Sequence, residues 1–294
     1  MSEQFMKTSL RCVAALCISA AVCGPALAQD GKAAKPETLD RGVFAGDWVT
    51  VGIGAGYGPS YDGSDDYILS PAPIVQGSVA GFAFGARGPG FYIDLIADGN
   101  GDKDVTFLAG PLVRVRMDRH SHMKDPIVRL LGKVDVAVEV GARAGVSFSK
   151  IIHAYDSLTI SSDIQWDVAN AHDGRLISPS ITYSTPLSTA IFTSVVLSAT
   201  HVDGRYADTY FSVNQAGSSA SGLPQFDARS GWKSYGASLL GGVDLSGDAR
   251  NGGWGVYSFV SYSRLTNDAK RSPITALRGD AAQWFVAGGI SYTF

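Results

Sequence analysis

Apolar and polar residues alternate with a period of two through most of the chain, in unusually long runs. From 134 to 148 every even-numbered residue is Val, Ala or Phe, whereas Asp135, Glu139 and Arg143 have the opposite parity. An α-helix would instead place apolar residues at i, i+3 and i+4. Soluble strands average about 5–6 residues, and a tilted membrane-spanning strand needs about 9–11. The long runs lie at 105–116, 134–148, 157–168, 175–187, 190–202, 232–245 and 253–265.

These lengths favour membrane-spanning strands over the alternative, a soluble sandwich whose apolar parity would face an internal core. Lipid offers no partner to an unpaired backbone group, so strands cross a bilayer only as a closed barrel. We therefore predict an all-β fold, an antiparallel transmembrane β-barrel over 47–294 that is closed by the C-terminal strand.

The strand count follows from the sidedness of the chain. If the first and last strands both meet the periplasm, the stretch 81–97 must contain two strands joined by the turn Arg87-Gly-Pro-Gly90. This predicts twelve strands, with ten as the alternative because the two segments are short. The same trace places 117–133, 169–174, 203–230 and 266–280 outside the cell and the shorter connections in the periplasm, the usual asymmetry of such barrels.

The first 28 residues have the pattern of a cleaved signal peptide. Lys7 and Arg11 precede a short apolar segment, and Ala26-Leu-Ala28 provides small residues for cleavage. We expect 29–46 to be a periplasmic segment and the protein to reside in the outer membrane of a Gram-negative bacterium. All three cysteines precede residue 29, which excludes disulfides and thiolate sites downstream.

Composition excludes further classes of protein. The net charge is -3 and no basic stripe is visible, which argues against a nucleic-acid partner. The glycines of "GIGAGYG" do not match a dinucleotide-binding loop, since Tyr57 and Pro59 occupy two of the required glycine positions. We interpret them as lumen-facing strand positions and expect no cofactor.

Three segments resemble the MipA/OmpV family of outer-membrane proteins. They are "GIGAGYGPSYDGSDDY" from Gly52, "TYFSVNQAGSSASGLPQFDARSG" from Thr209, and "SYSRLTNDAKRSPI" from Ser261. The resemblance implies a barrel with a role in the cell envelope and supplies no catalytic motif. The founding member is named for interacting with a murein transglycosylase, and its described role is to bridge a murein hydrolase and a synthase.

The resemblance makes a non-catalytic scaffold for murein-remodelling enzymes the leading functional hypothesis. Its partners would be outer-membrane lipid and lipopolysaccharide, the barrel-assembly machinery, and a periplasmic murein transglycosylase or synthase. A narrow pore for small solutes is the alternative, and adhesion or signal reception through outside loops is a third. A periplasmic enzyme would meet only 29–46 and the short turns, which conflicts with a large docking surface on the outside loops.

Two weaker patterns concern metal binding and hydrolysis. Asp98, Asn100, Asp102 and Asp104 alternate like the start of a calcium loop, but Lys103 replaces the turn glycine and no glutamate closes the pattern. Ser198, His201 and Asp203 could in principle meet at the barrel rim as a hydrolase site. We predict neither activity, and therefore no metal and no catalytic residue.

Charged residues of lumen parity carry both signs, and we expect them to pair and narrow the channel. They are Arg114, Arg116, Asp135, Glu139, Arg143, Asp163 and Asp167.

The loop 203–230 is long and contains large apolar side chains, so we predict that it is either an interaction surface or a plug over the barrel. The residues concerned are Tyr206, Tyr210, Phe211, Leu223, Pro224 and Phe226. The chain ends on Tyr292 and Phe294, which resemble the terminal aromatic signal that barrel-assembly machinery recognises.

Overall fold

The computed structural model describes residues 42–97 and 103–294, and within them thirteen strands form one antiparallel sheet. The strands are β1 (Trp48–Pro59), β2 (Tyr67–Pro71), β3 (Ile74–Val79), β4 (Phe82–Ala86), β5 (Gly90–Ile93), β6 (Val105–Arg116), β7 (Ala137–Ser149), β8 (Ser157–Asp167), β9 (Arg175–Pro186), β10 (Ile191–Val202), β11 (Gly231–Asp244), β12 (Gly253–Leu265) and β13 (Ala282–Thr293).

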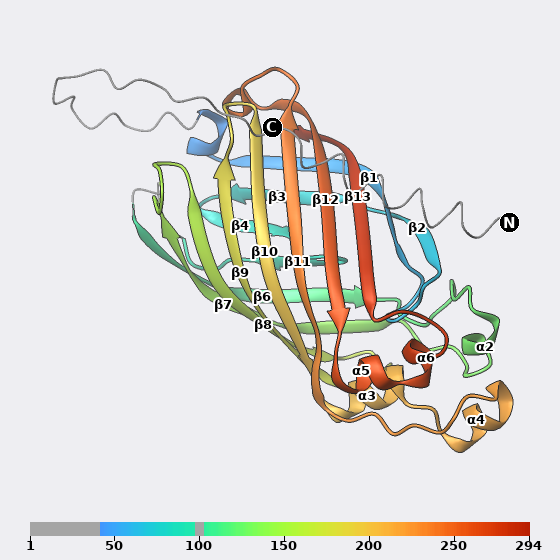
Figure 1. Ribbon diagram of the computed structural model, residues 1–294. Coiled ribbons are helices and arrows are strands. Elements are labelled where there is room, and N and C mark those ends of the chain that lie inside the picture. Colours follow the sequence, from blue (N-terminus) through green and yellow to red (C-terminus); the bar gives the residue numbers. More distant parts are fainter. Residues whose placement is uncertain (1–41, 98–102) are drawn as a thin grey trace, which may run out of the picture. The chain divides into compact units, whose positions relative to one another are not determined.

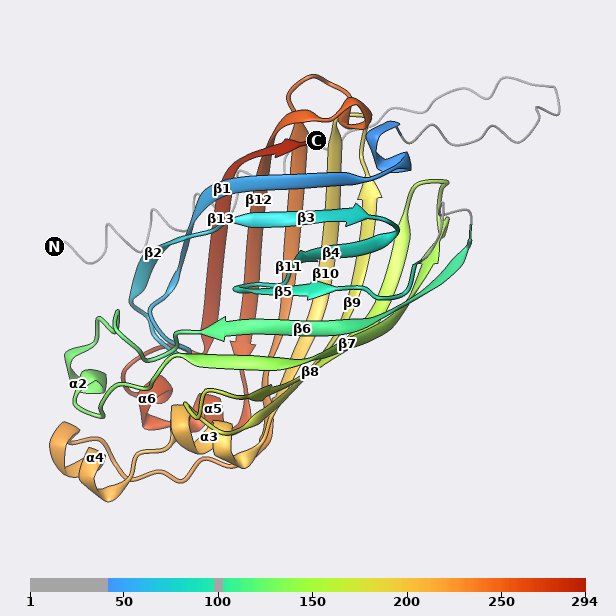
Figure 2. The same cartoon turned by 180° about the vertical axis from the view of Figure 1, so that it is seen from behind.

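The sheet closes on itself through its first and last strands. β1 pairs with β13 from Thr50 opposite Thr293 to Tyr57 opposite Val286, and β13 pairs with β12 on its other edge. Figures 1 and 2 show β9 to β13 on one side of the barrel and β1 and β3 to β6 on the other. The predicted closed antiparallel barrel is confirmed.

β2 and β3 occupy one position in the wall. β2 pairs with the half of β1 that ends at Pro59, and β3 pairs with the half that begins at Trp48. Pro71 and Pro73 flank the break between them, because proline has no N–H to donate to the neighbouring strand. The wall therefore has twelve strand positions, as predicted.

The short hairpin predicted between 81 and 97 is present as β4 and β5. Arg87 N–H donates to the carbonyl of Gly90 at 2.9 Å, which closes the turn. β4 and β5 have five and four residues, so this part of the wall is built of shorter strands than the rest.

The two strand parities face lipid and lumen as predicted. Val51, Ile53 and Tyr57 of β1 are exposed on the outer face, whereas three glycines of the opposite parity lie next to aromatic side chains. A side chain at Gly54 would overlap Tyr257, and one at Gly56 or Gly58 would overlap Phe285. The glycines thus make room for aromatic side chains at the inner wall, which is the lumen-facing position expected for them.

Long and short connections separate to opposite ends of the barrel. One end has the 3-10 helices η1 (Gly42–Ala45) and η2 (Ala249–Asn251) and short turns. The other end has α2 (Pro126–Arg129), α3 (Gly204–Phe211), α4 (Gln215–Ser221), α5 (Asn267–Arg271) and α6 (Pro273–Ala276) (Figures 1 and 2). We assign these ends to the periplasm and the cell exterior, respectively. None of the described helices is long and apolar enough to span a membrane.

The predicted signal peptide 1–28, and 29–41 of the predicted periplasmic segment, lie outside the described residues. The described chain begins with η1 and enters β1 at Trp48, one residue after the predicted start of the barrel.

Candidate functional site

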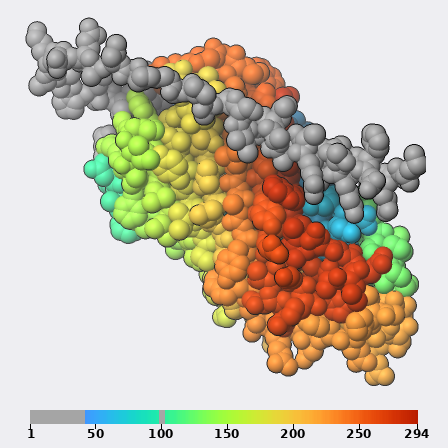
Figure 3. Space-filling view, viewed as in Figure 1, coloured from blue at the N-terminus to red at the C-terminus, as the bar shows by residue number. Residues whose placement is uncertain are grey.

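Four loops at the extracellular end fold over the lumen, and we call them together the extracellular cap. They are 60–66, 117–136, 203–230 and 266–281. Arg119 donates from Nη1 to the carbonyls of Thr209 and Tyr210, and Ser272 donates from Oγ to the carbonyl of Phe211 at 2.6 Å. Figure 3 shows the loops of α3–α4 and α5–α6 packed side by side.

Helix α3 presents one face to the lumen. Its N-cap is Asp203, whose Oδ1 accepts from Tyr206 N–H at 3.0 Å, a preferred helix start. Four residues of α3 are buried, in the i, i+1, i+4, i+5 spacing of a single helix face. They are Tyr206, Ala207, Tyr210 and Phe211, and they form a core with Leu176, Val202 and Leu265 at the strand ends. The helix is therefore anchored to the strand ends by apolar side chains.

Tyr206 is the centre of a cationic cluster. Its ring centroid lies 5.2 Å from Arg116 Cζ and 5.5 Å from Lys233 Nζ, within range of cation–π attraction. Lys233 also forms an ion pair with Asp62. Burial alone would raise the pKa of Asp62, but Lys233 and Arg116 outweigh it and hold that pKa below its usual value.

A second cluster joins β6 and β7 to the loop 168–174. Arg116 Nε donates to Glu139 Oε1 at 2.6 Å, and His172 Nε2 lies 3.3 Å from the same oxygen. His172 Nδ1 accepts from Gly174 N–H at 3.0 Å, which assigns the ring proton to Nε2. Neither Glu139 nor His172 is exposed. The carboxylate is therefore held by two donors.

A third cluster spans the lumen between the β4–β5 turn and β8. Arg143 Nη1 donates to Asp163 Oδ1 at 3.0 Å, and Arg87 Nε donates to Asp163 Oδ2 at 2.9 Å. Arg87 also donates to Ser180 Oγ at 3.0 Å. Arg87 lies four strand positions from β8 in the wall, so its side chain crosses the interior.

Asp118 has an unusual environment inside the cap. Its Oδ1 accepts from Asp62 N–H at 2.9 Å, and its Oδ2 is buried with no hydrogen-bond partner among the described residues. Burial, and then the nearby charge of Asp62, raise the pKa of Asp118 to about 6. This carboxyl is therefore a group whose ionisation weakens the cap.

The predicted pairing of lumen charges holds for Arg116 with Glu139 and for Arg143 with Asp163. Arg114 forms no ion pair within the described part of the chain. Asp135 is exposed and precedes β7, so its assignment to a lumen-facing strand position was wrong, because the chain is still part of the cap there. Asp167 ends β8 and accepts from four backbone N–H groups of 169–173, which shapes that loop.

The other residues of the predicted loop site are distributed over the cap. Leu223 is buried in a second apolar core with Tyr61, Val128 and Ile274, Phe226 packs against both cores, and Pro224 is exposed. Sequence reasoning missed Lys233, because it shares the odd-numbered parity of the lipid-facing residues Tyr235 and Leu239. Lys233 is nevertheless buried, at a register shift between β10 and β11 that leaves it without a paired residue. Sequence reasoning also missed Asp62 and Arg87, whose roles depend on loop paths that no periodic pattern reveals.

The residues considered for hydrolysis do not form a catalytic arrangement. His201 packs edge-on against Trp232 at 5.4 Å, and Asp203 caps α3. Residues 98–102 of the calcium-like segment lie outside the described residues, and Asp104 accepts from Lys150 at 3.0 Å. In the described part of the chain no three His, Cys, Asp or Glu side chains are placed to hold a metal.

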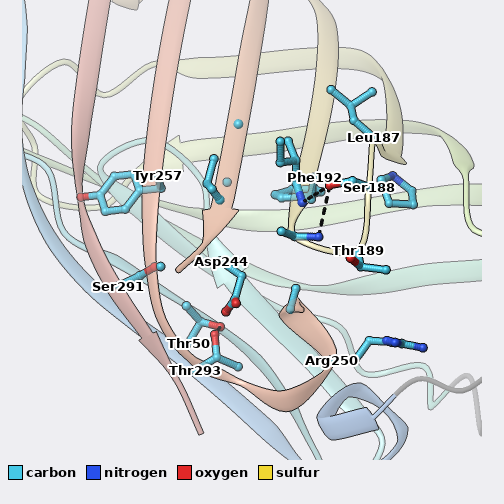
Figure 4. A pocket seen from close by; sticks show the side chains of 18 of the residues that line it. Thr50, Leu187, Ser188, Thr189, Phe192, Asp244, Arg250, Tyr257, Ser291 and Thr293 are labelled. Carbon is cyan, nitrogen blue, oxygen red and sulfur yellow. Dashed lines mark hydrogen bonds between the residues drawn. The ribbon is translucent and has the colours of Figure 1, made fainter. Parts of the chain in front are cut away.

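A cavity of about 860 Å³ occupies the periplasmic half of the lumen. In Figure 4, Tyr257, Ser291, Thr50 and Thr293 lie on one side of it and Leu187 and Phe192 on the other. Its lining is mostly apolar, with Phe44 and Trp48 contributed by the start of the described chain. The loops of the cap thus lie over one end of the lumen, and the cavity lies toward the other end.

A comparison of the sequence with models of protein families finds a match over most of the chain. Residues 51–294 match the family described as MltA-interacting protein MipA. The chain belongs to the MipA family. The match begins within β1 and ends at the last residue, so the matched region of this MipA-family barrel includes the cap and the cavity lining except Phe44, Trp48 and Thr50.

Solved structures similar to this MipA-family chain are outer-membrane proteins. An outer membrane channel from Pseudomonas putida F1 has 8% identity and a TM-score of 0.44, covering 88% of this chain and 100% of that chain. An anion-selective porin from Comamonas acidovorans has 10% identity and a TM-score of 0.34, covering 84% and 98%. OprD of Pseudomonas aeruginosa has 9% identity and a TM-score of 0.30, covering 87% and 98%. No curated protein matches the chain.

Proposed function

We propose that this protein is a non-catalytic outer-membrane scaffold whose barrel does not conduct solutes. The observation that carries the proposal is the closure of the extracellular end by α3, whose Tyr206, Tyr210 and Phe211 are almost completely buried. A passing ion or solute would have to displace this apolar core and the charge clusters beneath it. A loop that only bound ligands at the surface would leave its aromatic side chains accessible.

The arrangement of charge supports closure as well. Asp163 and Glu139 each accept from two donors, and breaking a buried pair by removing one partner typically costs about 3–5 kcal/mol. A water-filled pore usually keeps its charged side chains hydrated, whereas these side chains are mostly buried. The narrow pore is therefore the second candidate.

The partner that we propose is a periplasmic murein transglycosylase, as the family description suggests. The periplasmic end offers more for docking than its short turns suggest. Ile152, Leu187 and Leu245 are each exposed by more than 60% at this end, and the cavity opens among the same turns. Exposed apolar side chains around a concavity favour a protein interface.

Capture experiments test the scaffold. The purified barrel should retain the transglycosylase of its own organism, and Leu187→Asp combined with Leu245→Asp should weaken that retention. A matched control is Leu277→Asp, which changes a leucine of similar exposure in the extracellular cap. Failure of the parent barrel to retain any murein transglycosylase or synthase, under conditions where the barrel is folded, would remove the scaffold proposal.

A further inference from the structure

The cavity in the periplasmic half of the lumen has the properties of a site for a linear apolar ligand. Its volume of about 860 Å³ is within the roughly 300–1,000 Å³ of ordinary ligand pockets. Tyr257 and Leu240 line its inner part, and Phe192 and Ile74 line its sides. Phe44 and Trp48 lie at its periplasmic end. Charged residues of the lining, Asp244 and Arg250, adjoin the β11–β12 turn at the mouth.

Most polar groups of the lining already have partners. The hydroxyls of Thr50 and Thr293 bond to each other at 2.8 Å, and Tyr257 Oη donates to the carbonyl of Ala72. Ser188 Oγ accepts from two backbone N–H groups, and Thr189 Oγ1 donates to the carbonyl of Gly247. Such a lining offers few sites for ordered water, and apolar cavities without polar partners stay dry.

Three lining side chains form no hydrogen bond within the described part of the chain: the amide of Gln76, the hydroxyl of Ser291 and the hydroxyl of Tyr155, of which Tyr155 is exposed. Gln76 lies opposite Thr50 on β1, and Ser291 lies opposite the neighbouring inward residue Gly52. Gln76 and Ser291 therefore lie on the same wall, close to the periplasmic ends of their strands. A polar donor pair beside an otherwise apolar cavity matches a ligand with one polar group and a long tail.

The chain's own preceding segment is a poor occupant. Residues 29–41 read "QDGKAAKPETLDR", in which Leu39 is the one large apolar residue. Such a sequence would leave an apolar cavity unfilled and bury charged side chains without partners.

We propose that the periplasmic cavity binds the acyl chain of a fatty acid or phospholipid, with its carboxyl or ester group at Gln76 and Ser291 and its tail against Leu240 and Tyr257. The surrounding membrane supplies this chemistry. The proposal goes beyond the scaffold function and stands independently of it, because it needs no protein partner.

Photolabelling tests the proposal with the complete barrel in phospholipid nanodiscs. Two probes distinguish the source of the chain, a diazirine-bearing fatty acid and a phosphatidylethanolamine with the same diazirine in its acyl chain. Probe molecules in the surrounding bilayer will label outward residues such as Leu239 whether or not the cavity is occupied. A bound chain should also label the inward residues Leu240, Phe192 and Tyr257, and the probe that does so identifies the source.

Leu240→Trp is the blocking variant, and Leu239→Trp, one residue away on the lipid face and 44% exposed, is its matched control. The larger tryptophan side chain should exclude about two methylene groups of the bound acyl chain from the cavity, which should lower the labelling of the inward residues roughly tenfold. Leu239→Trp should leave that labelling unchanged. Heat-modifiable migration on gels verifies that both variants are folded. Labelling confined to outward residues with both probes, or inward labelling that survives Leu240→Trp, would overturn the proposal.

Discussion

Individual buried side chains decide whether this barrel is open or closed. Tyr206 touches an apolar core on one side and two cations on the other, since Arg116 and Lys233 both lie over its ring. Lys233 also donates weakly to the Tyr206 hydroxyl at 3.4 Å. One side chain thus links the apolar closure to the charge clusters below it, and its removal should affect both.

Tyr206→Ala should lower the free energy of cap opening by about 3–5 kcal/mol, the usual cost of truncating a fully buried aromatic side chain. Amide hydrogen exchange within 204–211 measures that free energy directly. Tyr235→Ala on the lipid face, where the side chain is exposed, is the control and should change exchange by less than about 1 kcal/mol. Equal effects of the two substitutions would mean that α3 is not a closure.

Asp118 predicts a pH dependence with a definite sign. The folded protein retains this proton up to about pH 6, whereas an unfolded aspartate loses it near pH 3.9. The contribution of Asp118 to the free energy of unfolding is therefore greatest below pH 4 and falls as the pH rises toward 6. Above pH 6 this contribution no longer changes. Asp118→Asn should raise the stability at pH 7 by up to about 3 kcal/mol.

The comparison of Asp118→Asn with the parent protein at two pH values isolates this effect. The variant should have the higher thermal midpoint at pH 7 and no advantage at pH 4. An advantage of equal size at both pH values would show that the substitution acts through packing and not through the buried charge.

At the scale of elements, the β4–β5 hairpin is fixed to the far wall by one carboxylate. Asp163→Asn would leave both Arg87 and Arg143 without their shared anion, and we expect a loss of about 3–5 kcal/mol in unfolding free energy. Arg87→Ala keeps the Arg143–Asp163 pair and should cost less than half as much. Urea unfolding of the refolded barrel measures both, and a larger loss for Arg87→Ala would contradict the shared-anion arrangement.

We predict that a substitution at the C-terminal residue, Phe294, impairs assembly of the barrel in cells. Phe294 exchanges backbone hydrogen bonds with Val49 at 2.9 and 3.4 Å, and its side chain is exposed. Phe294→Ala retains those backbone bonds, so refolding in detergent should proceed normally while the amount of folded barrel in cells falls several-fold. A matched decrease in detergent would show that the aromatic stabilises the barrel and is not a signal.

The sequence predicts the elements of the wall better than those of the cap. β6 and β12 begin and end at the predicted residues, because a lipid face and a lumen face impose alternation on every residue. The cap has no such constraint. Val134 fits the alternating pattern of the next strand, yet it packs in the core with Tyr206. Its place depends on contacts between distant loops, which local patterns do not encode.

The same limit applies to the candidate sites. Arg114, Arg116 and Glu139 share the lumen parity, so an ion pair between β6 and β7 could be expected. Parity could not select the partner, because Glu139 lies opposite Arg114 and pairs diagonally with Arg116. The contact of Arg87 with Asp163 could not be expected at all, since it depends on how the short hairpin tilts into the barrel. The periplasmic cavity was also unpredicted, because it arises where small residues such as Gly242 and Gly255 line the wall.

At the scale of the whole molecule, the cap covers one end of the barrel and the apolar cavity lies at the other. The cap has two apolar cores, the charge clusters lie at its inner side and in the lumen below it, and the periplasmic half has a mostly apolar cavity. This arrangement of cap and cavity is consistent with the proposed protein, which would bind a periplasmic partner and would not conduct solutes. If the proposed closure holds, loss of the cap should turn a non-conducting barrel into a channel.

Conductance across a planar bilayer tests the closed barrel most directly. The native protein should insert without steady unitary currents, and a variant with 204–228 replaced by a short Gly-Ser linker should show them, which confirms that insertion is detected. Regular unitary steps from the native protein, of the same size in every insertion, would contradict the closed scaffold and make the narrow pore the better account.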